Sequence, residues 1–505
     1  MLGNTGFLRV VMTAVLLVAG ASSHAATTDD DLVLLDRATW GMNETGLQAL
    51  RSMGREAWID HQLHPTPSDA LPTAAQTQID AMMISQHPMN TLVIDLQTRN
   101  RAANAMTDPA EKQVAQTEYQ KAMSDLARQT AARSLLRDLY APSQLRERLT
   151  WFWFNHFNVH QYKSDIRPML ADYEEHAIRD HALGRFRDLL GATARHPAML
   201  RYLDNAENAA GHLNENYARE IMELHTIGVG DGVYTQQDVQ ELARILTGFT
   251  IDPKPETPKL KPELQSQLVR DGLFEFNPNR HDYGDKLFLG HSVNGSGLGE
   301  LDQALDIISR HPSTARHIST QLATYFLGTP PPDALVQSMA ATFTRTDGDI
   351  AAVMAVLLHA KAFTAPVKDR FKDPVHYVLS AVRLAYDGRV IANTQPMQNW
   401  VNRMAEGLYN KETPDGFPMN AAAWTGPGQL AVRFEIARQI GSGSAGLFKP
   451  AGAEADQPAF PQLQSALYFA SLRQSLGAST RAALDQANSP QDWNTLYLSS
   501  PEFMN

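Results

Sequence analysis

Two glutamates, Glu220 and Glu223, stand at helical spacing with Asn216 in one polar stretch of the chain. Residues three or four apart lie on the same face of an α-helix, so these three side chains are expected to share a face. Two carboxylates on one face can act as general acid and base, or they can bind a divalent cation. The alternative is a buried network in which Arg219 and Arg244 neutralise the acids. The sequence leaves both interpretations open.

Other polar residues of the same stretch are expected to have different roles. At about 100° per residue, His225 falls half a turn away from the acids, so it cannot join them unless the helix unwinds before it. Asp238 stands in a Thr-x-x-Asp pattern that is typical of a helix N-terminus, which indicates capping rather than catalysis. Arg219 is spaced for a salt bridge with Glu223, and with Asn216 it is a candidate for positioning a substrate.

Two further groups of residues have side chains that are suited to chemistry. His281 and Asp282 lie in a predicted turn, where a loop can project one of them into a cleft as a second proton-transfer group. Asn155 and His156 belong to an aromatic segment and are candidates for hydrogen bonds to a substrate. His160 follows His156 by four residues, a spacing that lets two imidazoles on one helix bind a metal, but the glutamate of zinc proteases is missing.

The composition indicates a large globular protein with an acidic balance. The chain has 505 residues, of which 43% are hydrophobic and 20% are charged, and its formal net charge is -11. This balance argues against a nucleic-acid backbone or an anionic membrane surface as the main partner. No cysteine is present, which excludes disulfides, a thiol nucleophile and thiolate metal sites.

The N-terminus predicts export. Arg9 precedes an apolar run over residues 10–20, and small residues stand at the two positions that matter for cleavage near Ala25. This pattern is typical of a secretory signal peptide over residues 1–25. No later stretch is long and apolar enough to predict a transmembrane span. We therefore expect the mature protein to be periplasmic or secreted.

Hydrophobic periodicity predicts helices along most of the chain, so the expected fold is mostly α, a large single helical domain over residues 26–505. One small β-hairpin is expected where apolar residues alternate on both sides of a turn. Trp151 and Trp153 are expected in a buried aromatic core, with stacking on sugar rings as the alternative. The other expected features are a partly exposed helical hairpin (74–138), a Pro- and Lys-rich surface loop (250–267), the β-hairpin (272–294) and a flexible loop (441–461).

Several motifs together carry a resemblance to a known family. They are LLDRATWG, WFNHF, HALGRFRDLL, HPAMLRYLDN, NENYAREIMELHTIGVGDGVYTQQDVQELARILTG, HDYGDKLFLG, HPSTARHI and SSPEF, and they run from about Leu34 to Phe503. This set resembles the bacterial family catalogued as domain of unknown function 1800. The resemblance implies an exported protein, but no established activity or catalytic role comes with it. Genes of that family often neighbour those of the domain of unknown function 1501 family, which resembles sulfatases, so an exported sulfatase-like partner is implied.

Two functions from different classes follow. In the first, the protein is a periplasmic hydrolase or lyase that acts on a polysaccharide or another envelope polymer. Its proton-transfer groups are Glu220, Glu223, His281 or Asp282, and a divalent cation on the carboxylates is one form of this hypothesis. In the second, it is a non-catalytic assembly or binding protein for an exported partner, with the acids and arginines in a structural network and the helical hairpin as docking surface. Neither function involves nucleic acid.

Overall fold

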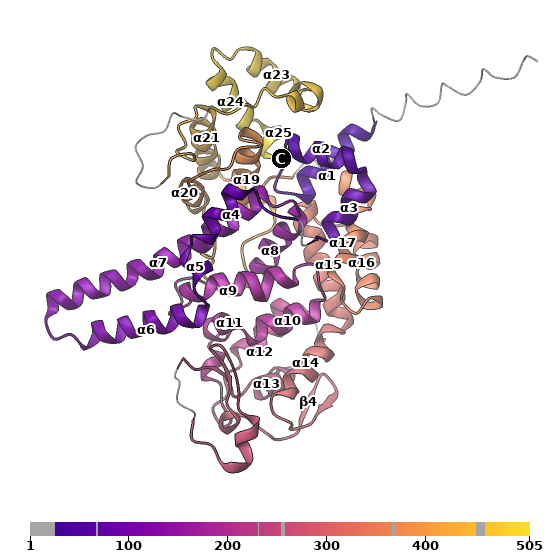
Figure 1. Cartoon of the computed structure of the whole chain (residues 1–505). Helices are drawn as coiled ribbons and strands as arrows, with labels where there is room; N and C mark the ends of the chain where they lie inside the picture. The colour runs from indigo at the N-terminus through magenta and orange to yellow at the C-terminus, as the bar shows by residue number, and fades with distance from the viewer. Residues whose placement is uncertain (1–25, 67–68, 231, 254–257, 366–369, 451–459) are drawn as a thin grey trace, which may run out of the picture.

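The computed structural model describes residues 26–66, 69–230, 232–253, 258–365, 370–450 and 460–505. The predicted signal peptide, residues 1–25, therefore lies outside the described residues. The described chain is mostly α-helical with a few short strands, which confirms the predicted fold class (Figure 1). None of the described helices is long and apolar enough to cross a membrane.

The N-terminal part of the chain extends a helical hairpin away from the body of the protein. Figure 1 shows α6 (Met89–Ala105) and α7 (Pro109–Tyr140) projecting side by side. A small satellite core of Leu92, Leu96 and Met123 with Leu126 holds these two helices together. The preceding helices are α1 (Ala26–Ala38), α2 (Glu44–Met53), α3 (Arg55–Leu63), α4 (Thr73–Asp80) and α5 (Met83–Gln86).

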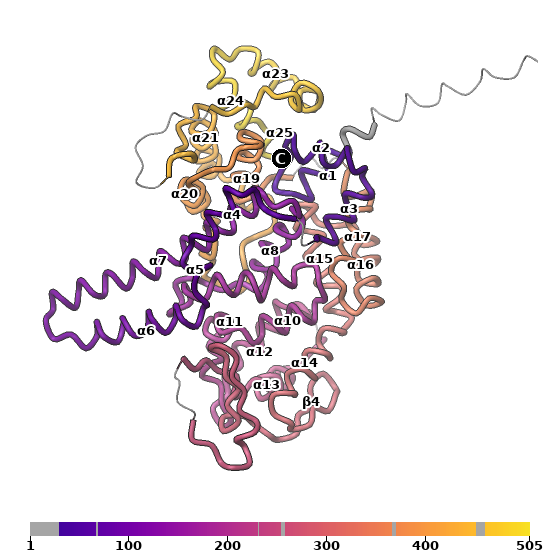
Figure 2. The backbone as a smooth tube through the Cα atoms, viewed as in Figure 1, coloured from indigo at the N-terminus to yellow at the C-terminus, as the bar shows by residue number. Residues whose placement is uncertain are grey.

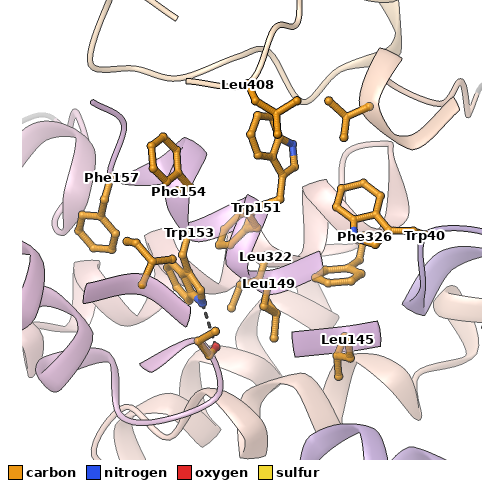
Figure 3. Packing of buried hydrophobic residues seen from close by; sticks show 14 of the residues in the cluster. Trp40, Leu145, Leu149, Trp151, Trp153, Phe154, Phe157, Leu322, Phe326 and Leu408 are labelled. Carbon is orange, nitrogen blue, oxygen red and sulfur yellow. Dashed lines mark hydrogen bonds between the residues drawn. The ribbon is translucent and has the colours of Figure 1, made fainter. Parts of the chain in front are cut away.

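Buried aromatic residues form the centre of the body around α8 (Gln144–His156). Trp153 is fully buried, and its indole N–H donates to the Ala182 carbonyl oxygen at 3.0 Å (Figure 3). Trp151 is buried as well, so this segment is core, as predicted. The elements that follow are η1 (Arg167–Met169), α9 (Leu170–Asp172), η2 (Tyr173–Ile178), η3 (Arg179–His181), α10 (Phe186–Arg195), α11 (Pro197–Tyr202), η4 (Asn205–Glu207), α12 (Asn216–Glu220), η5 (Ile221–His225) and α13 (Gln236–Ile245).

The short strands form two separate antiparallel sheets. β1 (Phe249–Ile251), β2 (Val269–Asp271) and β3 (Phe274–Phe276) make a sheet in the order β1-β3-β2. β4 (Lys286–Phe288) pairs only with β5 (His291–Val293). The predicted β-hairpin over 272–294 is therefore confirmed only in its second part, as β4–β5, whereas its first strand, β3, pairs with the two strands before it and not with β4.

The expected Pro- and Lys-rich loop, 250–267, contains more regular structure than its composition suggests. Its first two residues belong to β1, and its last six form the 3-10 helix η6 (Pro262–Gln267), which is largely exposed. Residues 254–257 lie outside the described residues. A further 3-10 turn, η7 (Pro278–Arg280), connects β3 to the segment before β4.

The C-terminal helices complete a core that runs through the described chain, since buried hydrophobic residues from Leu32 to Met504 belong to one continuous cluster. The C-terminus lies beside the first helices in Figure 2. In the expected flexible loop, 441–461, Leu447 is buried, whereas residues 451–459 lie outside the described residues. The helices of this part are α14 (Gly299–Ser309), α15 (Pro312–Leu327), α16 (Asp333–Arg345), α17 (Ile350–Leu358), α18 (Lys361–Thr364), α19 (Pro374–Ala385), α20 (Gln395–Arg403), η8 (Ala421–Trp424), α21 (Pro427–Gly441), η9 (Tyr468–Leu472), α22 (Arg473–Ser475), α23 (Ala478–Asp485), α24 (Pro490–Leu498) and α25 (Pro501–Met504).

Candidate functional site

The first helix of the polar stretch 213–248 changes its winding before it ends. α12 gives way at Ile221 to the π-helix η5, whose hydrogen bonds span five residues instead of four. Thr226 ends this turn with φ -137° and ψ -88°, and its hydroxyl donates to the Ile221 carbonyl at 2.6 Å. Single-turn π-helices often occur at functional sites. His225, which the spacing places off the acid face, lies in the core and is 1% exposed.

Glu220 and Glu223 are half-buried on this helix. Glu223 lies 3.5 Å from the guanidinium of Arg219, whereas Glu220 forms no hydrogen bond or ion pair with any residue that the structure describes. Burial raises the pKa of Glu220 above its usual range, and the charges of Glu223 and Asp415 raise it further against the effect of Arg219. The helix thus carries one accessible carboxyl group that holds its proton more tightly than a free glutamate does.

Asp415 belongs to a loop, residues 411–419, that is fixed to α8. Both polar atoms of the Asn155 side chain bind this loop: Nδ2 donates to the Phe417 carbonyl at 3.0 Å, and Oδ1 accepts from the Phe417 amide at 2.6 Å. Asn158 donates to two further backbone carbonyls of the loop, at 3.0 and 2.9 Å. Asn155 was predicted to bind a substrate, but here it positions the loop that brings Asp415 near Glu220.

Arg219 and Asn216, the other predicted substrate contacts, also bind neighbouring segments. Arg219 donates to Glu215 at 3.2 Å and to Gln236, at the start of α13, at 2.9 Å. Asn216 donates from its side chain to the Leu203 carbonyl at 3.3 Å. The Arg219 side chain is 37% exposed, so it stays accessible to a ligand beside the acids.

Asp238 is a helix cap, as the sequence predicts. Its carboxylate and the Thr235 side chain form the reciprocal hydrogen bonds of a capping box at the start of α13. The second carboxylate oxygen of Asp238 accepts a hydrogen bond from the Leu289 amide at 2.8 Å, which ties the β4–β5 hairpin to the helix.

His156 caps the end of the π-helix from inside the protein. Its Nε2 donates to the His225 carbonyl at 3.1 Å, and Nε2 of His317 donates to the Leu224 carbonyl at 3.2 Å, so both imidazoles satisfy carbonyl groups that a helix end leaves free. Burial lowers the pKa of His156 to about 3, and His317 contributes to this shift. His156 is therefore a neutral capping group. Because α8 ends at His156, the helical pair with His160 does not form.

His281 lies in a second, fully buried centre between α13, β4 and α14. Its Nδ1 donates to the Thr247 carbonyl at 2.8 Å, and its Nε2 lies 2.9 Å from a carboxylate oxygen of Glu300. Lys286 lies 2.5 Å from the other oxygen of Glu300, and the side chains of His281, Lys286 and Glu300 are fully buried. This closed arrangement ties the strands to the helices and leaves no face of His281 open to a substrate.

Asp282 is held by Arg244, which donates to both of its carboxylate oxygens at 2.9 and 3.2 Å. Arg244 also lies 2.6 Å from Glu241, three residues earlier on its own helix. No described contact joins Arg244 to Glu220 or Glu223, so its expected role in neutralising those acids is wrong. The predicted catalytic residues therefore lie in two centres that no hydrogen bond or ion pair among the described residues connects.

Few side chains of this site are available to bind a divalent cation. Glu220 and Glu223 supply carboxylate oxygens, which are ligands that calcium and magnesium prefer. Among the described residues, no group of three or more histidine, aspartate or glutamate side chains is arranged to hold a metal ion. A cation at the two glutamates takes its remaining ligands from water or from a substrate.

A third polar centre, which the sequence did not predict, surrounds a cavity of about 30 Å³ between α8 and α19. The cavity is lined by Arg148, Arg370, Lys372 and His376, among other residues. Asp36 of α1 lies 2.7 Å from Arg370 and 3.2 Å from Lys372. The sequence offers a weak signal for this centre, since two basic residues flank a phenylalanine directly before the Asp-Pro start of a helix.

Motifs from both ends of the sequence meet at this third centre. Arg148 lies over the ring of Trp40, 4.7 Å from its centre, and donates to the Thr39 carbonyl at 3.4 Å; both partners belong to LLDRATWG. Lys372 donates to the carbonyl of Phe503, in SSPEF, at 2.8 Å. The terminal motifs that carry the family resemblance therefore build one buried centre.

No curated protein and no solved structure matches the chain. A family model with the description "Protein of unknown function (DUF1800)" matches residues 33–505, a range that includes all three polar centres. The match therefore extends over nearly the whole described chain and confirms the resemblance found in the sequence. The chain belongs to the DUF1800 family of proteins of unknown function.

Proposed function

We propose that the protein is an exported enzyme, a hydrolase or lyase that acts on a polysaccharide or another envelope polymer, with Glu220 as its proton-transfer group. The supporting observation is the environment of Glu220, a half-buried carboxyl group that no described residue binds. Burial, Glu223 and Asp415 raise its pKa above the usual range. A general acid needs a proton that is not committed to a partner and a pKa raised towards the working pH; Glu220 has no partner among the described residues, and its pKa is shifted in this direction.

The residues around Glu220 have supporting roles in this proposal. Glu223 is paired with Arg219 at 3.5 Å, so it acts on Glu220 through its charge rather than as a second free acid. The exposed Arg219 side chain provides a cationic contact for the substrate. Asn155 acts through the loop 411–419, because it fixes the backbone next to Asp415.

Glu220→Gln tests the proposal with the purified protein and isolated envelope polysaccharides. A general acid contributes about 10²- to 10⁴-fold to the rate, so the variant should lose activity by that factor. Its melting temperature should not fall, because Glu220 has no bond to lose. Release of reducing ends identifies a hydrolase, and an unsaturated, ultraviolet-absorbing product identifies a lyase.

Asp238→Asn is the matched control: it alters a capping carboxylate of the same stretch and should keep the activity. A Glu220→Gln variant with the wild-type rate refutes the proposal.

The raised pKa also predicts a pH dependence. Glu220 acts as an acid while it is protonated, so the rate should fall as pH rises through its pKa, at a higher pH than for an ordinary glutamate. The free energy of unfolding should also fall as pH rises. The contribution of protonated Glu220 to stability is fully present below its unfolded-state pKa, and it is lost as pH rises through the raised folded-state pKa. Both dependences should be absent from Glu220→Gln in a pH–rate profile and in melting temperatures across the same pH range.

The projecting hairpin of α6 and α7 supports a second function, assembly with an exported partner such as a sulfatase-like protein of the domain of unknown function 1501 family. Ile94, Met106 and Val114 on this hairpin are 40%, 38% and 59% exposed, which is high for large hydrophobic side chains. A groove of about 800 Å³ runs beside the hairpin and is lined in part by Ile94. The burial of His156 and His281 also fits a protein without a shared catalytic cleft.

One complementation experiment separates the two functions. Ile94→Lys with Val114→Lys changes the hairpin surface, and Glu220→Gln changes the acid, each in a strain that lacks the native gene. Loss of function with Glu220→Gln alone supports the enzyme. Loss with the hairpin variant alone supports assembly.

A further inference from the structure

Four cationic side chains are buried in the third polar centre. Arg148, Arg370 and Lys372 line the cavity and are 1%, 8% and 4% exposed. Arg433, which is fully buried, lies behind Lys372 and donates to its backbone carbonyl at 2.7 Å. Asp36 pairs with Arg370 and Lys372, but Arg148 and Arg433 have no ion pair with any described residue. Buried charges are unfavourable unless they are paired, so this centre lacks negative charge.

Arg148 is held in place by aromatic rings rather than by an acid. Its guanidinium lies 4.7 Å from the ring centre of Trp40 and 4.8 Å from that of Tyr325, both within the range of cation–π attraction. Nη1 donates to Nδ1 of His376 at 2.9 Å. Nε is buried without a hydrogen-bond partner, and Nη2 makes no hydrogen bond to a described residue. Arg148 therefore has hydrogen-bond donors that the protein itself does not use.

His376 shows how positive the surroundings are. Because its Nδ1 accepts a hydrogen bond from Arg148, the ring is neutral and carries its hydrogen on Nε2, which is buried without a partner. Burial lowers its pKa well below the usual range, and the charges of Arg148, Arg370 and Lys372 lower it further. Another unused donor thus lies in the wall of the same cavity.

The acidic residues on the opposite wall supply less negative charge than their number suggests. Burial raises the pKa of Glu406 well above its usual range, and the adjacent Asp373 carboxyl raises it further. Both already accept backbone hydrogen bonds at the start of α19: Asp373 from His376 at 2.7 Å, and Glu406 from Val375 at 3.0 Å. No ion pair among the described residues joins either carboxyl group to Arg148 or Arg433.

We propose that this cavity binds one monovalent anion, either a halide ion or the carboxylate group of a ligand, which accepts the hydrogen bonds that Arg148 leaves unused. Its volume of about 30 Å³ exceeds the roughly 10–15 Å³ that one water molecule needs, so it admits a small group such as a halide ion or a carboxylate. The wall also contains Trp151, Trp424 and the exposed Pro418, so the cavity reaches the surface beside the loop 411–419. The rest of a carboxylate ligand lies there, against the two indole rings. The site does not depend on Glu220 or on an enzymatic function.

Thermal unfolding in the presence of chloride tests the site. The full purified protein is placed in a buffer free of halides and carboxylates, and ionic strength is kept constant with methanesulfonate. Binding to the folded state should raise the melting temperature by about 3 °C at a concentration about a hundred times the dissociation constant. Arg148→Met, which keeps the side-chain length but removes the charge, should abolish the rise. Arg316→Met, at an arginine whose side chain is 57% exposed, is the matched control and should keep it.

A second measurement keeps the proposal testable if Arg148→Met does not fold. Crystals of the wild-type protein grown with bromide should show an anomalous peak in the cavity, and acetate should displace it. If both chloride and acetate raise the melting temperature, the site binds a free ion. If only acetate or galacturonate raises it, the site binds the carboxylate group of a ligand. Equal chloride responses of wild type and Arg148→Met overturn the proposal. A bromide peak without any change in melting temperature also overturns it, because this indicates binding at crystal concentration only.

Discussion

Replacing Glu300 by glutamine removes the negative charge that lies between His281 and Lys286, with almost no change in size. Both ring nitrogens of His281 have hydrogen-bond partners, the Thr247 carbonyl at 2.8 Å and Glu300 at 2.9 Å. Lys286 donates to the other oxygen of Glu300 at 2.5 Å. Glutamine offers only one oxygen. Its NH₂ group must therefore take the place of one of the two carboxylate oxygens that bind His281 and Lys286.

The loss of stability in Glu300→Gln can be estimated from burial, since the side chains of this centre are fully buried. Removing one partner of a buried charged pair costs about 3–5 kcal/mol. The unfolding entropy is about 2.1 cal/mol/K per residue near 60 °C, which is roughly 1 kcal/mol/K for a chain of this length. Glu300→Gln should therefore lower the melting temperature by about 3–5 °C, measured by scanning calorimetry.

An exposed pair provides the control for Glu300→Gln. Asp333 and Arg316 are 82% and 57% exposed, so Asp333→Asn should shift the melting temperature by less than about 1 °C. Burial raises the pKa of Glu300, but hydrogen bonds from His281 and Lys286 outweigh it and hold the pKa below the usual range. The contribution of Glu300 to stability is therefore present above its unfolded-state pKa and is lost as pH falls through its folded-state pKa. In that low pH range the melting temperatures of the wild type and of Glu300→Gln should become equal. A shift at neutral pH no larger than that of Asp333→Asn would show that this centre does not stabilise the fold.

Two further substitutions test local geometry. Gly416 has a φ of +71°, and a Cβ there would lie 2.2 Å from the Asn155 carbonyl oxygen. Gly416→Ala should therefore cost about 1–3 kcal/mol of stability and speed proteolysis within the loop 411–419. Equal stability and equal protection from proteolysis would contradict the position given to the loop. Thr235→Ala removes one half of the capping box of α13 and should cost about 1 kcal/mol, seen as a lower urea midpoint, whereas Thr235→Ser should retain most of the stability.

Helix starts are the part of the fold that the local sequence determines most directly, because short-range chemistry decides them. His196 and His311 each precede a proline, and each ring accepts a hydrogen bond from the backbone of the helix that follows. Asp238 forms the capping box that its spacing from Thr235 indicates. In all these cases the deciding atoms lie within three residues, so the sequence contains the whole interaction.

Other features depend on contacts that local patterns do not encode. The π-helix after Glu220 breaks the 3.6-residue period on which helical faces are predicted, and no local residue pattern marks its start at Ile221. The strand β3 contains a good alternating pattern, but the pattern does not specify its partner. Arg148 and Asp36 lie far apart in sequence from Arg370, so their common centre appears only in the folded structure.

The contacts of Lys372 and Arg370 join the two ends of the chain and thereby set when the protein can finish folding. Arg370 binds a residue 334 positions earlier, Asp36, and Lys372 binds a residue 131 positions later, Phe503. Closing such long loops costs entropy, so these contacts form late. A nascent chain that still lacks Phe503 cannot complete the centre and stays short of its native state.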